Sequence, residues 1–484
     1  MHGITSFGCY LPRLRLSREA IVQAHAWGNR ALRAHGKGER SMCNWDEDSV
    51  TMAVAAGRAC LAGRDEKSIS SVFLASTSLP FADRQNAGIL ANALMLSPEV
   101  LSLDVTSSQK AGTSGLVAAL ELAGAREGEV LFTASEKRRA KPASVQELWY
   151  GDGAAALSLG REGVLAEFLG AASRTVDFVD HYRGEDRTYD YNWEERWIRD
   201  EGYMKIVPPA INDLLDQTGV PAGDIRHFVM PCVFPAVPRN IAKQLGFSAE
   251  SLSESYSAQC GEAGTAHPLL MLAGALDKAL PGDTILLVGF GQGCDALLFR
   301  ATDALASHQG NGAGINAALA NRREETNYHK FLTFTHQVEK EFGIRAEVDI
   351  PTPLSALYRN KDMVLGMIGG QCSACGTPQF PRSQVCVNPE CKATGTQEPY
   401  SFADRKAKVN SWTADHLTYT LDPPGHYGMV QFEDGGRFMA DFTDVEEGGL
   451  EVGMPVRMAF RIKSFDERRG FRRYFWKAVP VGEG

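Results

Sequence analysis

The sequence predicts an α/β fold built from two related halves, followed by a smaller region made of strands. Strands and helices alternate over residues 1–302, which is typical of layered α/β proteins. A strand–turn–helix pattern of the first half returns in the second half. Short alternating strands then occupy residues 399–484, as in a small all-β barrel.

The elements of the α/β part follow from apolar runs and from helix start and stop signals. We expect strands over residues 4–10, 71–75, 100–105, 129–134, 153–159, 165–172, 227–230, 285–289 and 296–300. We expect helices over residues 17–25, 46–60, 86–96, 113–124, 206–218 and 238–245. In the second helix, acidic residues occupy the first turn and Gly63 lies just past the end.

The stretch from Leu101 to Leu120 organises the α/β part. An apolar strand ends at Val105, small residues form a turn over 106–112, and an Ala- and Leu-rich helix follows. The start of a helix leaves backbone N–H groups without helical partners, and together with the helix dipole they favour anionic groups. This turn is therefore the first place where a reactive site is expected.

Two short patterns of the first half recur in the second half. Residues 109–113, QKAGT, start one helix as residues 261–265, GEAGT, start another. Residues 151–157, GDGAAAL, are echoed by residues 293–298, GCDALL. Echoes at similar offsets indicate a duplicated α/β half and not a short solenoid repeat.

Length and charge bound the functional classes. A chain of 484 residues is too long for one ordinary core, so two or three domains are expected. The formal net charge of -9 argues against a nucleic-acid-binding protein. No apolar run is long enough to span a membrane, and the first residues lack the apolar core of a signal peptide. We therefore expect a cytoplasmic protein with no membrane partner, in which the six scattered cysteines are reduced thiols.

Residues 175–201 are unusual because aromatic side chains occur there among many charges. The segment contains His181, Tyr182, Tyr189, Tyr191, Trp193 and Trp197. It could be a cap that faces the substrate, or a surface excursion whose aromatic side chains pack on the body. We favour the surface excursion, because loops of this length have no fixed role.

Four stretches carry a resemblance to a known family. They are residues 3–12, 44–53, 150–157 and 289–293. Residues 1–302 resemble the thiolase superfamily, nearest to its hydroxymethylglutaryl-CoA synthase and ketoacyl synthase III branch. The resemblance implies a duplicated five-layered fold with halves over residues 1–165 and 166–303. It also implies acyl-CoA thioesters as substrates and a homodimer.

The nucleophile position departs from that family. Condensing enzymes of this branch carry a Cys at the start of the organising helix, within a pattern like Asn-Ala-Cys-x-Gly-Gly-Thr. The matching stretch here reads Ser107-Ser108-Gln109-Lys110-Ala111-Gly112-Thr113, so Gln109 occupies the Cys position. A carboxamide cannot form a thioester, so acyl-enzyme chemistry is not expected at Gln109.

Three other positions of the family's chemistry also depart. Thr77 falls where the synthases have a Glu, and Pro231-Cys232 falls where a His is expected. Glu262 falls on an expected Asn in the ungapped register. A shifted register instead puts His267 on the Gly-His-Pro motif of thiolases proper. The sequence leaves this register open.

Three functions fit these departures. The first is an aldol or retro-aldol (lyase) reaction on an acyl-CoA, with Glu262 or His267 as the base and donors near Gln109 for an enolate. The second is decarboxylation, because decarboxylating ketosynthase-like domains also carry Gln for Cys, although they keep their histidines. The third is a non-catalytic subunit of an acyltransferase complex with a further thiolase-like partner. We favour the first and keep a hydroxymethylglutaryl-CoA synthase-like condensing acyltransferase as an alternative.

Four further residues are candidates for reactivity or binding. Cys232 could be a reactive thiol at a strand end, although such cysteines are usually buried and inert. Lys110 could bind a phosphate of coenzyme A, or it could be a solvated surface lysine. Gly291 and Gly293 could form a cofactor-binding turn, but their run is too short for a dinucleotide fingerprint.

Residues 366–398, which follow a linker with helices over 304–365, hold the strongest local signal. One knuckle is formed by Cys372 and Cys375, and a second by Cys386 and Cys391. Four thiolates on two short knuckles bind Zn²⁺ tetrahedrally and leave no open position for catalysis. We therefore expect a structural zinc ribbon, and this spacing in an intracellular protein argues against disulfides.

Residues 399–484 contain the short strands of the second part. They are expected over residues 408–414, 427–432, 437–442, 456–462 and 474–479. Together with the zinc ribbon they resemble the DUF35 family of OB-fold proteins, which has a typical turn matched by residues 452–456. The resemblance implies a companion of thiolase-like acyl-CoA enzymes. In an acidic chain it points to a channel for coenzyme A thioesters and not to nucleic acid.

Overall fold

A computed structural model describes residues 1–308, 312–346, 353–446 and 448–481. The chain divides into two compact units. The first comprises Met1–Cys43, Asp48–Ala91 and Leu96–Phe331, and the second comprises Asn44–Glu47, Asn92–Met95 and Leu332–Gly484. The main boundary falls inside the predicted linker, of which residues 309–311 and 347–352 lie outside the described residues.

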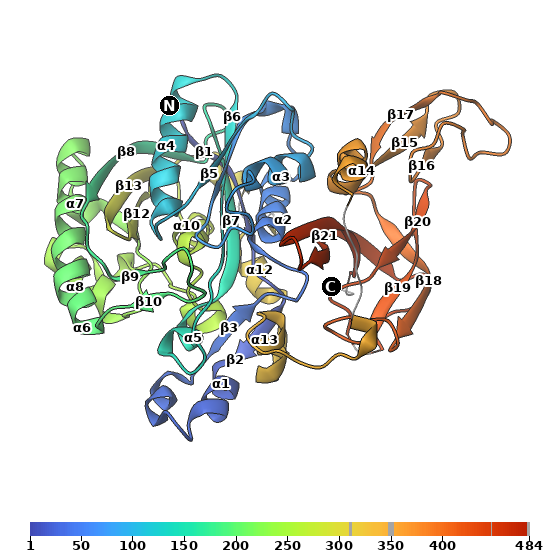
Figure 1. Ribbon diagram of the computed structural model, residues 1–484. Helices are drawn as coiled ribbons and strands as arrows, with labels where there is room; N and C mark the ends of the chain where they lie inside the picture. The colour runs from blue at the N-terminus through green and yellow to red at the C-terminus, as the bar shows by residue number, and fades with distance from the viewer. Residues whose placement is uncertain (309–311, 347–352, 447, 482–484) are drawn as a thin grey trace. The chain divides into compact units, whose positions relative to one another are not determined.

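The first unit is built on one nine-stranded mixed sheet (Figure 1). Its strand order is β11 (Ile225–Val229), β12 (Thr284–Phe290), β13 (Gly293–Ala301), β8 (Ala166–Thr175), β1 (Gly3–Tyr10), β7 (Asp152–Gly160), β6 (Glu129–Lys137), β4 (Ile69–Ala75) and β5 (Leu101–Val105). Each of the nine expected strands overlaps one of these. The two halves join where Gly3 and Ile4 of β1 pair with Glu167 and Ala166 of β8.

The pairing pattern repeats between the two halves. In the first half, β4 and β6 are parallel and β6 and β7 are antiparallel. In the second half, β11 and β12 are parallel and β12 and β13 are antiparallel. The short sequence echoes therefore do mark a repeated α/β half, as predicted.

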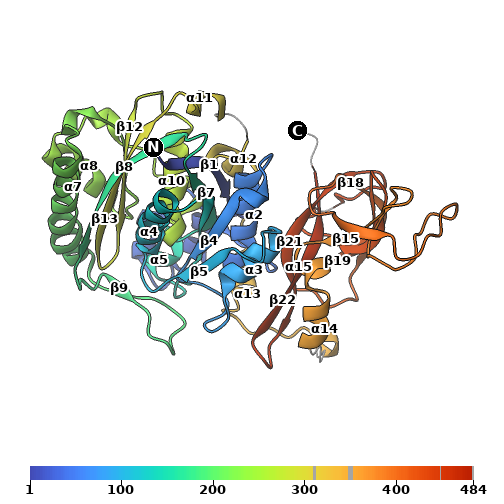
Figure 2. The ribbon, with the colours of Figure 1, turned by 90° about the horizontal axis from the view of Figure 1, so that it is seen from above.

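Helices form layers outside and between these strands (Figure 2). α4 (Ala111–Ala125) packs on β6 and β7, α10 (His267–Leu276) packs on β11 and β12, and the two helices contact each other. α2 (Ser49–Leu61) packs on β1 and β7, whereas α7 (Met204–Thr218) packs on β8 and β13. The layers are α2, the strands of the first half, α4 with α10, the strands of the second half, and α7. This is the expected five-layered arrangement.

Local chemistry explains how two of these helices begin. Asp48 caps α2: its carboxylate accepts from the N–H groups of Val50 and Thr51, and the Thr51 hydroxyl accepts from the Asp48 N–H. The predicted helix therefore starts later, at Ser49. At the start of α4, Gly112 lies so close to the backbone of Thr265 that a Cβ would sit 2.1 Å from its carbonyl oxygen. Glycine thus lets the two helix starts approach each other.

Further strands and helices complete the first unit and begin the second. The other strands before residue 332 are β2 (Leu14–Ser17), β3 (Glu39–Met42), β9 (His181–Tyr182), β10 (Tyr191–Asn192) and β14 (Arg323–Glu325). The other helices are α1 (Arg18–His25), α3 (Asn86–Ala93), α5 (Val145–Trp149), α6 (Glu195–Trp197), α8 (Ala236–Leu245), α9 (Ser257–Cys260), α11 (Leu305–His308), α12 (Ile315–Ala320), α13 (Tyr328–Phe334), α14 (Leu354–Arg359) and α15 (Lys361–Leu365). None of the described helices combines the length and hydropathy needed to cross a membrane.

The second unit contains two sheets. The smaller consists of β16 (Pro378–Gln379), β15 (Ile368–Cys372) and β17 (Gln397–Ser401), in that order. The larger has the order β20 (Arg437–Asp441), β19 (Gly425–Phe432), β18 (Ala407–Asp415), β21 (Pro455–Asp466) and β22 (Phe471–Pro480). A bridge between Phe442 and Ala478 links its two edges. All five expected barrel strands are present, and the predicted OB fold is confirmed.

Candidate active site

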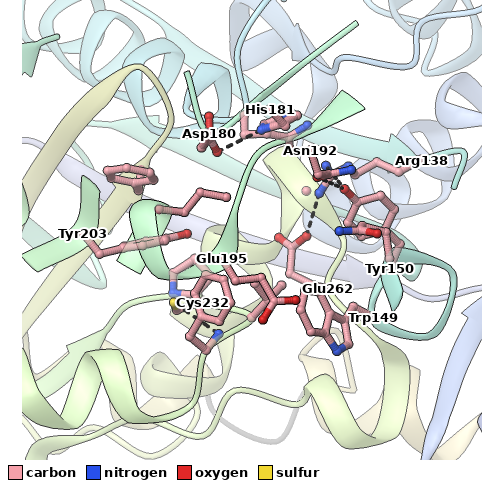
Figure 3. A pocket seen from close by; sticks show the side chains of 18 of the residues that line it. Arg138, Trp149, Tyr150, Asp180, His181, Asn192, Glu195, Tyr203, Cys232 and Glu262 are labelled. Carbon is pink, nitrogen blue, oxygen red and sulfur yellow. Dashed lines mark hydrogen bonds and ion pairs between the residues drawn. The ribbon is translucent and has the colours of Figure 1, made fainter. Parts of the chain in front are cut away.

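A pocket in the first unit brings together several segments that are distant in the sequence (Figure 3). It encloses about 770 Å³ of empty space, open solvent at its mouth included. Its lining includes Gln109, Arg138, Tyr150, His181, Cys232 and Glu262. Three of the four predicted catalytic residues, Gln109, Cys232 and Glu262, therefore meet in one place.

The two helix starts contribute Gln109 and Glu262. Gln109 lies two residues before α4, and Glu262 lies in the connection between α9 and α10. The backbone of Glu262 is held by the neighbouring chain: its N–H donates to Trp149 O at 2.7 Å, and its carbonyl accepts from Gly151 N at 3.0 Å. Main-chain pairing therefore fixes where the Glu262 side chain enters the pocket.

A chain of hydrogen bonds orients the Gln109 carboxamide. Gln109 Nε2 donates to Thr77 Oγ1 at 3.2 Å, and Thr77 Oγ1 donates to Glu136 Oε2 at 3.1 Å. Glu136 is buried at the end of β6, and it also accepts from the Thr77 N–H at 3.1 Å and from the Thr265 hydroxyl at 2.9 Å. Because the Thr77 hydroxyl gives its hydrogen to the carboxylate, it can accept from Gln109, so the amide nitrogen faces Thr77.

The Gln109 carboxamide also presents an unpaired acceptor. Its Oε1 is buried, and no donor in the described part of the chain reaches it. Buried polar atoms are paired in most native proteins, so such an atom calls for an explanation. Because Gln109 lines the pocket, a ligand that donates a hydrogen bond is the simplest one.

A charged cluster forms another part of the pocket. Arg138 donates to Glu262 Oε2 at 3.0 Å, to Asp190 Oδ2 at 3.0 Å and to the Tyr150 hydroxyl at 2.6 Å. Arg183 also donates to Asp190, at 2.7 Å. Burial opposes ionisation of Asp190, but the neighbouring positive charges, that of Arg138 first, outweigh it and lower the pKa of this carboxyl. The cluster is therefore an ionised network in which one arginine serves two carboxylates.

The unusual segment 175–201 provides part of the pocket wall. Asp180, His181, Asn192 and Trp193 line the pocket, whereas Tyr182 and Tyr191 are each 54% exposed. His181 Nδ1 lies 2.8 Å from Asp180 Oδ2. We favoured a surface excursion, and the structure shows that the segment also faces the pocket. Local sequence could not show this, because the hairpin of β9 and β10 folds back over residues far away in the chain.

Cys232 lies in the pocket but is a poor nucleophile as it stands. It follows β11, and its Sγ accepts from the Phe234 N–H at 3.4 Å. Burial raises the pKa of the Cys232 thiol to about 12. Its side chain lines the pocket, and its reactivity stays a prediction.

Four of the predicted site residues do not line the pocket: His267, Lys110 and the glycine pair 291 and 293. His267 is buried with its ring between backbone groups: Nδ1 accepts from Ala263 N at 3.2 Å, and Nε2 lies 2.8 Å from Ser255 O. Burial also lowers the pKa of His267. Lys110 Nζ lies 3.3 Å from Asp295 Oδ1, in a mostly buried ion pair and not in open solvent.

The glycine pair 291 and 293 has a structural explanation. The Gly291 N–H donates to Gly293 O at 3.1 Å, which closes a tight turn between β12 and β13. Gly293 has φ +120°, and a Cβ there would sit 2.0 Å from the carbonyl oxygen of Arg174. Only glycine fits that position. The expectation that this turn binds a cofactor gains nothing from this geometry.

Several site residues were missed in the sequence, among them two at the end of one strand. Glu136 and Arg138 stand at the end of β6, in the run Glu136-Lys137-Arg138. A charged run at the carboxyl end of a buried strand is a usable signal, because α/β proteins place ligands outside these strand ends. The pairing of Asp180 with His181 in the following segment left no comparable pattern.

The second unit holds a cluster of four cysteines. Cys372, Cys375, Cys386 and Cys391 place their sulfur atoms within 4.8 Å of one another. Four thiols this close could hold one metal ion. The predicted set of ligands therefore converges in space, on the small sheet of β15, β16 and β17 and the turns beside it.

Comparisons with known proteins agree with this architecture. A family model described as "3-Oxoacyl-[acyl-carrier-protein (ACP)] synthase III C terminal" matches residues 215–301. A second model, "ChsH2, C-terminal OB-fold domain", matches residues 400–461. A crystal structure described as HMG-CoA synthase complexed with CoA superposes with a TM-score of 0.61 at 18% identity, covering 72% of this chain and 94% of that chain. At that identity the likeness shows the fold.

Similarity in sequence shows the family. The hydroxymethylglutaryl-CoA synthase of Pyrobaculum arsenaticum is 31% identical over 346 residues, which covers 70% of this chain and 98% of that protein. The hydroxymethylglutaryl-CoA synthase of Archaeoglobus fulgidus is 32% identical over 319 residues, which covers 64% and 91%. The chain therefore belongs to the hydroxymethylglutaryl-CoA synthase family of the thiolase superfamily, extended by a C-terminal OB-fold domain of the ChsH2 type.

Proposed function

We propose that this protein catalyses aldol-type formation or cleavage of a carbon–carbon bond in an acyl-CoA thioester, without an acyl-enzyme at residue 109. Its family membership and the likeness to a structure described with bound CoA support an acyl-CoA substrate. The observation that carries the aldol chemistry is the Gln109 carboxamide, which lines the pocket with an unpaired oxygen.

The carboxamide suits a ligand that carries both a donor and an acceptor. Gln109 Nε2 gives one of its two hydrogens to Thr77, and the other can serve a carbonyl oxygen. Gln109 Oε1 needs a donor, and pairing it would recover a cost of about 1–3 kcal/mol. A 3-hydroxyacyl thioester, which is the product of an aldol addition, offers a hydroxyl donor and a thioester carbonyl close together. A 3-ketoacyl thioester offers acceptors in both places and fits less well.

A condensing reaction through an acyl-enzyme on Cys232 is the second candidate. The observation in its favour is that Cys232 lines the same pocket. Against it, a thiol whose pKa is raised to about 12 is thiolate in roughly one molecule in 10⁵ at neutral pH. A nearby base would first have to remove this proton. The aldol route needs no thiolate, so we place it first.

The test is incubation of the purified full chain with 3-hydroxyacyl-, 3-ketoacyl- and malonyl-CoA, read by mass spectrometry. We expect a 3-hydroxyacyl-CoA to yield a carbonyl compound and a shorter acyl-CoA, with no mass added to the protein. An acyl group mapped to Cys232 would replace the proposal by an acyl-enzyme mechanism. Loss of CO₂ from malonyl-CoA would identify a decarboxylase. No turnover of any substrate would favour a non-catalytic subunit.

Matched variants test the role of Gln109. Gln109→Leu keeps the size of the side chain and removes both polar ends, so turnover should fall by about 10²-fold or more, as when a donor to a developing charge is removed. Gln217→Leu, at an exposed position of α7, is the control and should leave turnover unchanged. Equal rates for the two variants would contradict the proposed role of the carboxamide.

We also propose that the four-cysteine cluster binds a structural Zn²⁺. With Zn–S bonds of about 2.3 Å, tetrahedral geometry separates the sulfur atoms by about 3.8 Å. The Sγ atoms of Cys372 and Cys391 lie 3.9 Å apart, and those of Cys375 and Cys386 lie 3.6 Å apart. These two separations match a tetrahedral zinc site, and all four sulfur atoms lie within 4.8 Å of one another. Zinc would cross-link the two knuckles and supply no catalytic step.

A homodimer is proposed on the basis of the sheet edge. β5 is the last strand of the nine-stranded sheet, and its Leu101 and Leu103 are each 41% exposed. An edge strand with exposed apolar side chains is ready to pair with another chain. Pairing of β5 with β5 of a second copy would cover these leucines.

A further inference from the structure

The pocket contains a histidine–carboxylate pair that no predicted mechanism uses. His181 and Asp180 both line the pocket, and each side chain is 14% exposed. His181 is the one histidine among the described residues of this lining. An imidazole has one ring nitrogen that donates and one that accepts, which is the property that a proton-transfer group needs.

The contact with Asp180 fixes the state of the ring. His181 Nδ1 lies 2.8 Å from Asp180 Oδ2, and an ionised carboxylate can only accept a hydrogen bond. Nδ1 therefore carries the proton, and Nε2 has the lone pair of a base. Orientation of an imidazole by a carboxylate on Nδ1 is the arrangement that general-base histidines use in other enzymes.

The backbone around the pair is also held in place. His181 of β9 pairs with Asn192 of β10, and the Trp193 N–H donates to the Asp180 carbonyl at 2.9 Å. The two strands form a short antiparallel hairpin that carries the pair to the pocket (Figure 3). This pairing with β10 makes the two residues a positioned dyad and not part of a loose loop.

Apart from Glu195, whose side chain is exposed, the other titratable groups of the pocket are engaged or hold their protons. Glu262 is held in an ion pair by Arg138, with Arg138 Nη1 3.0 Å from Glu262 Oε2. Burial raises the pKa of Tyr150, Tyr203 and Cys232, so these groups stay protonated at neutral pH. His181, whose Nδ1 is held by Asp180, is thus the group of this lining that the geometry favours for proton transfer.

We propose that His181 is the proton-transfer group of this site and that Asp180 is its positioning residue. The inference rests on the proposed acyl-CoA chemistry. In the cleavage direction, the 3-hydroxyl group turns its one hydrogen from Gln109 Oε1 to His181 Nε2, which takes this proton; the hydroxyl oxygen forms a carbonyl, and the bond between C2 and C3 breaks. Its electron pair passes to the thioester as an enolate. The imidazolium then returns the proton to C2, so a 3-hydroxyacyl-CoA gives one carbonyl compound and one acyl-CoA with no oxidant or cofactor.

The test uses two readouts on the full chain. The first is exchange of the C2 hydrogens of acetyl-CoA in D₂O, followed by NMR, which needs the base and the enolate but no carbon–carbon step. The second is turnover of the 3-hydroxyacyl-CoA. His181→Ala should lose about 10²–10⁴-fold in both, and added imidazole should restore part of the loss. His181→Gln should show the same loss, and it replaces the alanine variant if that variant folds poorly.

The chain offers a matched control. His227 also pairs with a carboxylate, with Nε2 3.2 Å from Asp283 Oδ2, but it does not line the pocket. His227→Ala should leave both readouts unchanged. Asp180→Asn should lower kcat with little change in KM, and Asp180→Glu should restore part of kcat, which a merely structural role would not produce.

The outcomes separate this inference from the proposed function. Exchange that depends on His181, without any carbon–carbon turnover, would support the dyad and contradict the aldol reaction alone. If the His181 variants turn over substrate within threefold of the wild-type rate, only the dyad is contradicted. A threefold change corresponds to about 0.65 kcal/mol of transition-state stabilisation. A wild-type protein that shows neither exchange nor turnover would overturn both.

Discussion

Replacement of Arg138 by methionine should leave two mostly buried carboxylates without their arginine partner. Arg138 forms ion pairs with Asp190 and Glu262. The side chains of Arg138, Asp190 and Glu262 are 6%, 4% and 14% exposed. Methionine keeps much of the side-chain volume and removes the charge and every donor. Removing one partner of a buried ion pair costs about 3–5 kcal/mol, because the other charge stays buried and unpaired.

The structure indicates the lower end of that range. Asp190 keeps a second cation, Arg183 at 2.7 Å, so the loss falls mainly on Glu262. We expect Arg138→Met to lower the free energy of unfolding of the first unit by about 3 kcal/mol. Adding Glu262→Gln removes the stranded charge, so the double variant should recover about 1–2 kcal/mol of this loss.

The assay must report on the first unit alone, because a chain of two units need not unfold in one step. Hydrogen exchange in increasing urea, followed by mass spectrometry on peptides from β6 and β7, gives that local free energy. Arg174→Met is the control, because its ion pair with Asp213 is 42% and 43% exposed and should contribute less than about 1 kcal/mol. The reasoning about the unpaired charge is wrong if Arg138→Met lowers the free energy of unfolding no more than this control does. It is also wrong if adding Glu262→Gln lowers that free energy further.

The same network predicts a pH dependence. The folded pKa of Asp190 is lowered below its ordinary value of 3.8, so unfolding takes up a proton and stability rises with pH across this window. The contribution is fully present above 3.8 and is lost as the pH falls through the lowered value. Arg138→Met should therefore reduce the acid sensitivity of the first unit, which the exchange measurement repeated at low pH would detect.

Three further predictions concern separate parts of the molecule. Thr77→Val removes the hydroxyl that links Gln109 to Glu136. Turnover should fall by 10-fold or more in steady-state kinetics, and the free energy of unfolding should fall by about 1–3 kcal/mol in urea. Thr77→Ser should retain both. The purified chain should contain about one Zn²⁺ by elemental analysis. Cys372→Ser should lose this zinc and destabilise the ribbon, as measured by hydrogen exchange on residues 366–398. A variant that keeps its metal would count against the site. Leu101→Lys should shift the protein from dimer to monomer in light scattering, and an unchanged mass would argue against pairing through β5.

The sequence by itself determined the elements whose causes are local. The barrel strands of residues 399–484 were predictable because alternation with period two reports one buried face of a strand. The Cys372 to Cys391 cluster was predictable because its four cysteines lie on two short turns, with a spacing that is typical of zinc sites. The duplicated half was visible because the turn at Gln109 and the turn at Glu262 repeat the same small residues at a helix start.

The tertiary structure decided what depends on long-range approach. Whether Glu262 or His267 faces the pocket was open in the sequence, and main-chain pairing of Glu262 with Trp149 and Gly151 settled it. The dyad of Asp180 and His181 could not be recognised, because the hairpin that carries it reaches the pocket only when residues 175–201 fold back over the helix starts. Sequence patterns record which face of an element is buried, whereas a site is a convergence of side chains from elements whose relative placement no local pattern encodes.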